Sequence, residues 1–311
     1  MTQKEVLQKM VAEPILFEEP LANHTSIKIG GPAMAFITPK DETELVTVLQ
    51  WAKTQKLSHC IFGKGSNTLV RDGGFPGVVL SLTKAFREWK IERQENNFVW
   101  VRVQGGVPTQ QFVRWGSSLG LKGIEFLAGI PGTLGGNVVM NAGTTLGSIS
   151  ELIEEVTVID QKGKRKNWLQ KECHFTYRSS EIPTACVVVD ALLKLEQGEV
   201  AGVEEKVKAL FESRGLSQPV TQPNLGSVFK NPTHGKTKLA KAWELIDEAG
   251  LRGVRVGKAR ISEKHTNFIV NEGGATARDV MVLINLVKER VRAASGILLE
   301  TEVKIIGEDA A

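Results

Sequence analysis

The sequence predicts an α+β protein in which a strand-rich N-terminal part precedes a smaller part that contains more helix. Up to about residue 196, stretches such as "GVVLSL", "FVWVRV", "EVTVID" and "CVVVDALLKL" are typical of strands. Three amphipathic helical patterns follow, and two strand patterns, "NFIV" and "LLETEVKII", flank the last of them. We therefore expect a domain boundary near residue 197, where the pattern changes.

Helices are predicted where apolar residues recur every three or four positions between end signals. Asp41 and Glu44 form a capping box at the first helix, Pro108 takes the first position of the second, and Gly296 follows the last. The expected helices cover residues 41–56, 108–120, 200–214, 238–249 and 276–294. The basic run from Lys162 to Lys166 lies between two strand patterns, so we expect a solvated hairpin turn there.

Composition and charge exclude several functional classes. The 311 residues are 41% apolar and 24% charged, which is typical of a globular protein with a substantial core. No stretch has the roughly 18 apolar residues of a membrane span, and the N-terminus lacks a secretory leader pattern. The net charge is only +4, and the three cysteines form no C-x-x-C motif. We expect a cytoplasmic monomer with no nucleic-acid or membrane partner.

The stretch "GIPGTLGGNVVMNAG", residues 129–143, contains five glycines and two asparagines. Glycine is retained where the backbone needs a positive φ or where a ligand touches the main chain. Two interpretations are open: a compact turn between strands, or a bed of backbone N–H groups against a phosphate chain. A second loop, "FGKGSNTLV" at 62–70, lies in the same strand-rich part, and the two could hold opposite sides of one diphosphate.

Three common ligand sites are disfavoured. "KNPTHGKT" has Lys230 where a P-loop needs its first glycine, and "GKGSNT" has Thr68 where a dinucleotide fingerprint needs its third. The five histidines lack the spacing of metal ligands. Three short polar stretches in apolar surroundings remain as candidates: "YRSS" at 177–180, "GSVFKNP" at 226–232 and "ETEV" at 300–303.

Seven motifs together carry a family resemblance. "TSIKIGGPA", "GKGSN", "GIPGTLGGNVVMNAG", "YRSS", "GSVFKNP", "EKHTNFIVN" and "ETEVKIIG" occur in this order over residues 20–307. In this combination the chain resembles the MurB family, the UDP-N-acetylenolpyruvoylglucosamine reductases. The resemblance implies a two-lobed FAD-binding region of the vanillyl-alcohol-oxidase (PCMH) type, with lobes at 1–83 and 84–197, and a smaller α/β substrate-binding domain at 198–311.

The resemblance also implies an activity. NADPH would reduce FAD, and a hydride would then pass from N5 of the flavin to C3 of an enolpyruvyl ether on a UDP-sugar, with protonation at C2. The product would be UDP-N-acetylmuramate, a peptidoglycan precursor. The charge that develops on the substrate carboxylate needs a cation, a hydrogen-bond donor and a proton source away from water.

The same resemblance implies residue roles. Arg178 would bind the carboxylate, Ser227 would protonate C2, and Glu302 would donate a hydrogen bond as a neutral acid, which requires a raised pKa. Glu300 lies two residues before Glu302, so the choice between them rests on the family's "EV" ending. The implied FAD contacts are Gly63, Lys64, Gly65, Ser66, Asn67, Thr68, Gly129, Pro131, Gly132, Thr133, Gly136, Asn137 and Asn141. The implied substrate contacts are Lys230, Asn231 and His265.

Three features depart from the longer relatives. Ser217 stands where many relatives have the lysine of K-Q-P, and Glu244 replaces a lysine expected in the following helix. The only tyrosine is Tyr177, and no tyrosine-bearing loop follows "YRSS", so the chain resembles the shorter type. Two rival functions stay open: a flavin oxidase of the same fold that uses oxygen, and a nucleotide-binding protein without catalysis. The "GSVFKNP" and "ETEVKIIG" motifs argue against the oxidase, and the intact Arg178, Ser227 and Glu302 argue against the non-catalytic protein.

Overall fold

The chain forms two compact units whose segments alternate along the sequence. The computed structural model describes residues 3–234, 237–238 and 240–310. The first unit contains Met1–Glu18, Met34–Lys64 and Gly77–Ser213, and the second contains Glu19–Ala33, Gly65–Pro76 and Arg214–Ala311. Two short pieces of the N-terminal third therefore belong to the second unit. The functional division at residues 83 and 197 stays a prediction.

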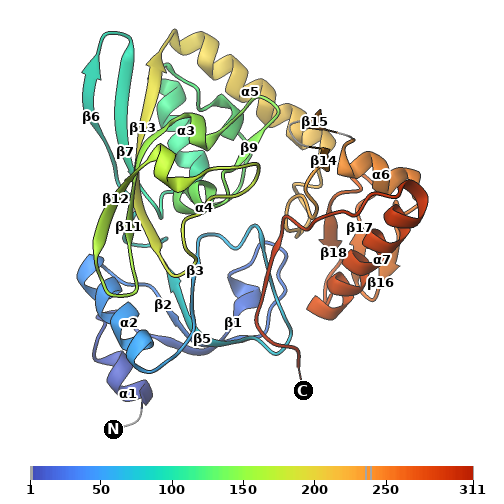
Figure 1. The fold of residues 1–311 in the computed structure, drawn as a ribbon, viewed down its shortest axis with the longest axis horizontal. Helices are drawn as coiled ribbons and strands as arrows, with labels where there is room; N and C mark the ends of the chain where they lie inside the picture. Colours follow the sequence, from blue (N-terminus) through green and yellow to red (C-terminus); the bar gives the residue numbers. More distant parts are fainter. Residues whose placement is uncertain (1–2, 235–236, 239, 311) are drawn as a thin grey trace. The chain divides into compact units, whose positions relative to one another are not determined.

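The first unit is built on an antiparallel sheet in the order β12-β11-β13-β7-β6, with β8 also paired to β13 (Figure 1). The strands predicted from "FVWVRV" and "CVVVDALLKL" pair with each other, and Val101 lies opposite Leu193. Helices α3 and α4 place Phe112 and Val138 in the same core as these strands. The elements are β6 (Trp89–Glu95), β7 (Phe98–Gln104), α3 (Thr109–Ser118), β8 (Leu121–Lys122), α4 (Leu134–Val139), β11 (Ile153–Ile159), β12 (Arg165–Leu169) and β13 (Val187–Gln197).

A second sheet has the order β1-β2-β5-β3, and helix α2 packs Leu45 and Leu49 into its core. The predicted cap is confirmed in part. Glu44 N–H donates to the side chain of Asp41 at 2.9 Å, but the Glu44 carboxylate accepts from the N–H groups of Ala12 and Lys40 in place of that of Asp41. The elements are α1 (Gln3–Gln8), β1 (Leu16–Pro20), β2 (Pro32–Ile37), α2 (Glu42–Thr54), β3 (His59–Phe62) and β5 (Phe75–Ser81). Residues at one end of β1, β2 and β5 belong to the second unit.

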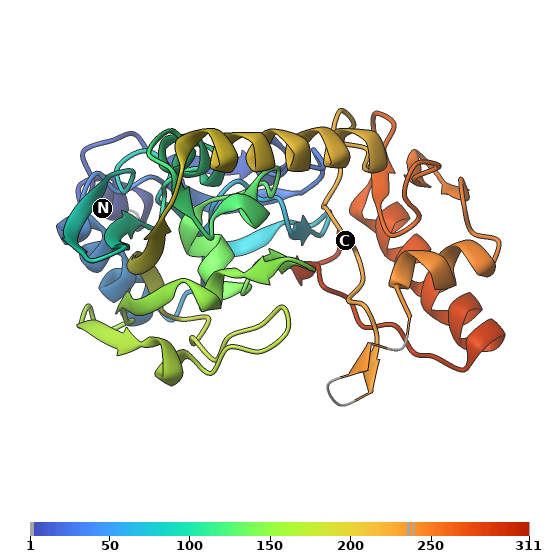
Figure 2. The ribbon, with the colours of Figure 1, turned by 90° about the horizontal axis from the view of Figure 1, so that it is seen from above.

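Helix α5 (Val200–Ser217), drawn along its full length in Figure 2, buries Val203 and Val207 in the core of the large sheet. The basic run is the predicted hairpin turn between β11 and β12, where Asp160 accepts from the N–H groups of Lys162 and Lys164. The N–H of Lys164, with the ammonium of Lys166, lowers the pKa of Asp160 to about 2. Short pieces complete the unit: η2 (Glu125–Leu127), β9 (Gly143–Thr144), β10 (Gly147–Ser148), η3 (Ile149–Glu151) and η4 (Gln170–Cys173).

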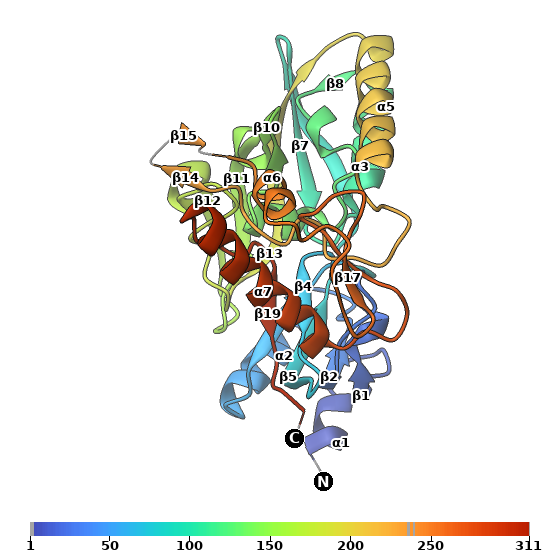
Figure 3. The same ribbon diagram turned by 90° about the vertical axis from the view of Figure 1, so that its right-hand side faces the viewer.

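The second unit packs helices α6 and α7 around a core that contains Phe229, Ile246 and Ile284. Strand β4 pairs in parallel with β19, so that residues 68–70 lie beside 304–306 (Figure 3). The small antiparallel sheet has the order β16-β17-β18. The elements are η1 (Leu21–Asn23), β4 (Thr68–Val70), β14 (Thr233–His234), β15 (Thr237–Lys238), α6 (Ala242–Glu248), β16 (Arg255–Val256), β17 (Ala259–Ile261), β18 (Ile269–Asn271), α7 (Ala277–Ser295) and β19 (Lys304–Ile306).

Several predicted boundaries were wrong. Pro108 is the N-cap of α3 in extended conformation, because Thr109 is the first helical residue. The helix expected from residue 238 begins at Ala242, since 237–238 pair with 233–234 as a hairpin. The expected strand 298–306 is regular only over 304–306, and Thr301 makes an isolated bridge to Phe229. Within the described residues, no helix is long and apolar enough to span a membrane.

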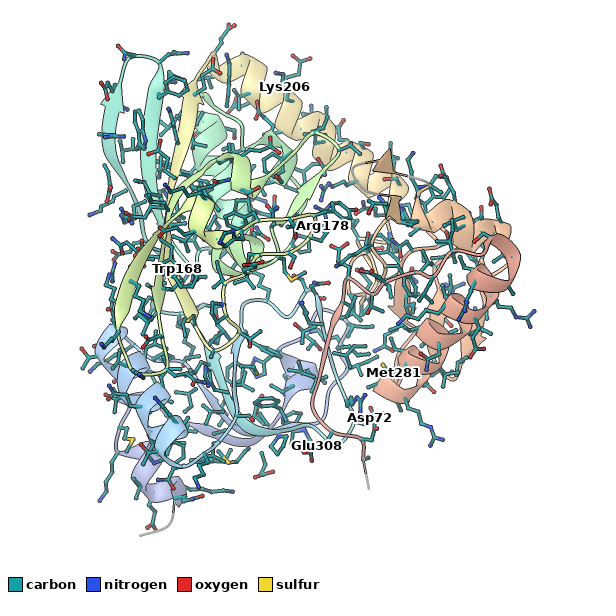
Figure 4. All side chains as sticks on the ribbon, in the orientation of Figure 1. Asp72, Trp168, Arg178, Lys206, Met281 and Glu308 are labelled. Atoms are coloured by element: carbon teal, nitrogen blue, oxygen red, sulfur yellow. The ribbon has the colours of Figure 1, made fainter. Side chains whose placement is uncertain are left out.

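Asp72 links the segment 65–76 to the start of α7. Its two carboxylate oxygens accept from the N–H groups of Ala277 at 2.7 Å and Arg278 at 2.9 Å, while Thr276 and Asp279 form a capping box. Figure 4 shows Asp72 close to Met281 of α7. Two helix-terminal donors thereby gain a charged acceptor at the positive end of the helix.

We expect Asp72→Ala to lower the free energy of unfolding by about 1–2 kcal/mol, the usual cost of losing a helix cap. Urea unfolding of the purified protein measures this change. The matched control is Asp309→Ala, because Asp309 is 79% exposed and makes a surface ion pair with Arg71. That variant should lose no more than about 0.5 kcal/mol. Equal losses in the two variants would contradict a capping role for Asp72.

Candidate active site

The glycine-rich stretch contains glycines retained for two different reasons. A Cβ on Gly135 would lie 3.0 Å from the carbonyl oxygen of Gly105, and one on Gly143 would lie 2.5 Å from that of Gly147. The packing of the protein itself requires glycine at both positions. Gly136 differs, because it is exposed and a Cβ there would meet nothing closer than Thr133 Oγ1 at 3.7 Å. Nothing in the first unit explains why Gly136 lacks a side chain.

Backbone conformation adds a second constraint on this stretch. Gly129 and Gly132 have φ values of 74° and 116°, which disfavour any residue with a side chain. The N–H of Gly129 donates to Gln110 Oε1, and the N–H groups of Leu134 and Gly135 donate to the carbonyls of Val107 and Gly105. A diphosphate bound to this stretch would therefore use other backbone donors.

The two asparagines of the stretch are buried and bonded within the first unit. Asn137 Nδ2 donates to Thr109 Oγ1 at 2.7 Å. Asn141 Nδ2 donates to the carbonyl of Thr176 at 2.8 Å, and its Oδ1 accepts from the N–H of Ser150 at 3.2 Å. These bonds fix the shape of the glycine-rich stretch. Direct cofactor contacts by the two side chains stay a prediction.

Arg178 lies in a tight turn beside this stretch (Figure 4). Thr176 and Ser179 exchange both backbone hydrogen bonds, so Tyr177 and Arg178 are the two residues at the tip. Arg178 has a φ of 58°, an unfavourable value for an arginine, where turns usually have glycine or asparagine. Its Nη2 donates to the carbonyl of Gly143 at 2.6 Å. A strained arginine held against the glycine-rich stretch is a candidate for function.

The "GKGSN" motif is divided between the two units, which the sequence did not predict. Gly63 and Lys64 belong to the first unit, where a Cβ on Gly63 would lie 2.5 Å from Thr133 Oγ1. Residues 65–68 belong to the second unit. Gly65 has a φ of 56°, a side chain there would collide with the carbonyl of His24, and its own carbonyl accepts from the N–H of Ser26.

Within the second unit, three of the predicted motifs lie side by side. Asn67 Nδ2 donates to the carbonyl of Glu302 at 3.3 Å, and its carbonyl accepts from the N–H of Lys304 at 3.0 Å. The N–H of Glu302 donates to the carbonyl of Val228 at 2.8 Å, one residue after Ser227. "GSN", "GSVFKNP" and "ETEV" are therefore joined by hydrogen bonds to the backbone carbonyls of Glu302 and Val228.

The structure separates the two glutamates of "ETEV" by their surroundings. Glu300 has a side chain that is 75% exposed, and its Oε2 lies 3.5 Å from Lys230 Nζ. Glu302 is half-buried, and its backbone is held between Asn67 and Val228. Glu300 thus neutralises a lysine at the surface, while Glu302 has the more enclosed position.

The side chains of Asn231 and Glu244 both accept hydrogen bonds from backbone N–H groups at the start of α6. Asn231 Oδ1 accepts from the N–H of Ala242 at 2.9 Å, and Glu244 Oε2 accepts from the N–H of Lys241 at 3.1 Å. Asn231 therefore retains only its Nδ2 donors for a ligand, and the substrate contact stays a prediction. Glu244, which replaces an expected lysine, completes a capping box.

His265 is held as a neutral imidazole. The N–H of Asn267 donates to Nδ1 at 3.3 Å, which leaves the proton on Nε2. Burial lowers the pKa of His265, and the charge of Arg252 acts in the same direction. The ring packs edge-on against Phe268, with the centroids 4.8 Å apart. A neutral imidazole can donate a hydrogen bond from Nε2 to an anionic ligand.

Each unit therefore assembles one group of the predicted site residues. Residues 63–64, 129–141 and Arg178 belong to the first unit, and residues 65–68, Ser227, Lys230, Asn231, His265 and Glu302 belong to the second. Sequence reasoning missed the supporting residues Thr109 and Asn267, because no local pattern marks a side chain that bonds a distant backbone. Among the described residues, no group of His, Cys, Asp and Glu could hold a metal ion.

Comparison with known proteins adds a family to this geometry. Residues 33–167 match the FAD binding domain family, and residues 218–306 match the C-terminal domain of UDP-N-acetylenolpyruvoylglucosamine reductase. The reductase of that name from Geotalea uraniireducens is 43% identical over 94% of this chain and 94% of its own. The one from Clostridium tetani is 36% identical over 98% and 96%. The crystal structure of UDP-N-acetylenolpyruvylglucosamine reductase (MurB) from Thermus caldophilus matches with a TM-score of 0.79 at 32% identity, over 94% of this chain and 98% of that one.

The lowered pKa of His265 predicts a pH dependence of stability. Below about pH 6.5 the unfolded chain binds a proton at this histidine more readily than the folded chain does, so stability is lost as the pH falls. His265→Gln should lose less stability between about pH 7.5 and 5.5, as measured by urea unfolding. Burial lowers the pKa of His59 in the first unit as well, so His59→Gln should have a separate, additive effect. If His265→Gln lost as much unfolding free energy as the wild type between these pH values, a buried neutral imidazole at His265 would be contradicted.

Proposed function

The chain belongs to the family of UDP-N-acetylenolpyruvoylglucosamine reductases, and on that premise we propose that it reduces UDP-N-acetyl-3-O-(1-carboxyvinyl)glucosamine to UDP-N-acetylmuramate with NADPH. The family makes it an FAD-dependent oxidoreductase of peptidoglycan precursor synthesis. The observation that carries the proposal is that hydrogen bonds join Arg178 to the glycine-rich stretch in the first unit, and Asn67, Glu302 and the segment after Ser227 in the second. We propose a cytoplasmic monomer, which agrees with three free, non-paired cysteines.

The residues of the first unit fit an FAD diphosphate. Gly136 presents exposed backbone where a Cβ has room, so its missing side chain is explained by a group that lies against it. The positive φ values of Gly129 and Gly132 shape the same surface. The residues that would hold the cofactor are Gly63, Lys64, Gly129, Pro131, Gly132, Thr133, Gly136, Asn137 and Asn141 of this unit, with Gly65, Ser66, Asn67 and Thr68 of the second unit. When bound, FAD supplies hydride transfer, from NADPH and on to C3 of the enolpyruvyl group.

Arg178 binds the substrate carboxylate in this proposal. A guanidinium offers a planar pair of donors that matches a carboxylate, and its charge stabilises the electron density that enters the carboxylate during reduction. The tight turn and the bond to the carbonyl of Gly143 hold the side chain before substrate arrives. The positive φ of Arg178 agrees with this role, because backbone strain is often retained at functional sites.

Ser227 and Glu302 complete the chemistry from the second unit. Ser227 gives its hydroxyl proton to C2, and Glu302 donates a hydrogen bond to the developing charge as a neutral acid. The N–H of Glu302 is bonded to the carbonyl next to Ser227, so the two residues share one rigid backbone arrangement. Lys230, Asn231 and the Nε2–H of His265 would bind the diphosphate of the UDP-sugar, which is the proposed small-molecule partner.

Gly136→Val tests the cofactor surface. We expect a folded protein without the flavin absorption bands, because two methyl groups would occupy the space of the ligand. The matched control is Gly202→Val, also a helical glycine, around whose Cβ position there is no atom within 4 Å. Visible spectra and circular dichroism of both variants measure the result. Stoichiometric FAD in Gly136→Val would mean that this glycine does not contact the cofactor.

Ser227→Ala tests the proton donor. Flavin reduction by NADPH should proceed at a near-normal rate, because it needs no proton on carbon, while reoxidation by the enolpyruvyl substrate should slow about 10²- to 10⁴-fold. Stopped-flow absorbance in the flavin band separates the two phases. Ser227→Cys should recover part of the rate, and Ser295→Ala, in the last turn of α7, is the control. Equal slowing of both phases would show that Ser227 shapes the site without donating the proton.

A further inference from the structure

The segment that contains Ser227 and Lys230 is held from two sides. On one side it pairs with the C-terminal motif: Glu302 N–H donates to the carbonyl of Val228 at 2.8 Å, and Lys230 N–H donates to that of Glu300 at 2.9 Å. Val228 and Phe229, between the two polar residues, are buried at 0% and 2% exposure. The segment is thus a short extended piece whose apolar residues anchor it in the core.

Asn267 holds the other side with three hydrogen bonds. Its backbone carbonyl accepts from the N–H of Val228 at 2.9 Å. Its side-chain Oδ1 accepts from the N–H of Phe229 at 2.9 Å, and its Nδ2 donates to the carbonyl of Phe229 at 2.8 Å. The side-chain amide therefore satisfies both polar groups of one buried residue, as a neighbouring strand would. Asn267 itself is only 4% exposed.

Asn267 also connects this segment to His265. The N–H of Asn267 donates to His265 Nδ1 at 3.3 Å, which selects the tautomer with its proton on Nε2. One residue thus bonds to the backbone next to Ser227 and to the imidazole ring. The pairing of Val228 with Glu302 extends the same set of bonds to the proposed acid.

We propose that Asn267 is a positioning residue for the protonation step, an inference that rests on the proposed function. Its amide fixes the backbone at Val228 and Phe229, and thereby places the Ser227 hydroxyl relative to Glu302. A reacting group displaced by about 1 Å can lose about 10²-fold in rate. Asn267 touches neither substrate nor cofactor in this proposal, and it acts through Ser227.

A second buried asparagine of the same unit provides a matched control. Asn271 is 7% exposed, its Nδ2 donates to the carbonyl of Ile27 at 2.9 Å, and its Oδ1 accepts from the N–H groups of Gly273 and Ala275. Asn271 lies at the end of β18, four residues after Asn267. Its side-chain bonds hold other loops, so a change there should affect stability without displacing Ser227.

The test compares Asn267→Asp with Asn271→Asp in the FAD-loaded protein. At Asn267 the introduced carboxyl keeps the acceptor for Phe229 N–H but sets an oxygen against the Phe229 carbonyl. We expect reoxidation by the enolpyruvyl substrate to slow about 10- to 100-fold, with reduction by NADPH within about twofold of wild type. Amide hydrogen exchange of peptides that cover 226–232 should be faster in Asn267→Asp. Asn271→Asp should retain both flavin rates and the exchange of 226–232.

A double variant tests whether the slower reoxidation in the Asn267 variant arises through Ser227. If Asn267 acts through Ser227, adding Asn267→Asp to Ser227→Ala should slow reoxidation no further. Multiplicative effects, or equal slowing in the Asn271 variant, would overturn the proposal. Asn267→Ser, which removes the amide and both of its bonds to Phe229, gives the same comparison should the Asp variant fail to fold. Failure of wild type to be reoxidised would overturn the proposed function instead, and hydrogen exchange would still report whether Asn267 holds residues 226–232.

Discussion

The parallel pairing of β4 with β19 is the constraint on which the second unit depends. Three residues near the N-terminus, 68–70, lie beside 304–306 at the other end of the chain, and both Leu69 and Val70 are fully buried. Closing so long a loop costs entropy, which the buried side chains and the backbone bonds must offset. The pairing brings Asn67 to Glu302, and Glu302 in turn pairs with the segment after Ser227. One set of hydrogen bonds thus connects the proposed acid Glu302, the segment after the proposed proton donor Ser227, and Asn67 of the proposed cofactor loop.

Glycine has two distinct roles in the cofactor half of the site. Gly135 and Gly143 are required by close backbone contacts within the protein, and Gly65 by both its φ and the carbonyl of His24. Among the residues that the structure describes, none comes close enough to require glycine at position 136, because space remains around its missing side chain. A compact turn accounts for Gly135 and Gly143, and a ligand surface is the proposed reason for Gly136. Only the second kind argues for a bound group.

Local signals in the sequence were sufficient for the element types and for most helix ends. The N-cap at Asp41 and the stop at Gly296 are short-range features, and the structure confirms both. The α+β class and the exposed basic hairpin were also predicted. The later start of α6 was not, because it depends on a hairpin with residues 233–234. The division of "GKGSN" between two units could not be predicted either, since it depends on contacts with residues hundreds of positions away. The roles of the predicted site residues came from a family resemblance, because a serine after glycine resembles any turn residue.

In the proposed mechanism, one unit carries the cofactor surface with Arg178 and the other carries the protonating residues. An anaerobic titration of the purified, FAD-loaded protein tests the proposed reduction most directly. One equivalent of NADPH should bleach the flavin band, and one equivalent of UDP-N-acetyl-3-O-(1-carboxyvinyl)glucosamine should then restore it, with UDP-N-acetylmuramate formed in equal amount. A flavin that stays bleached with this substrate and recovers only when oxygen is admitted would contradict the account.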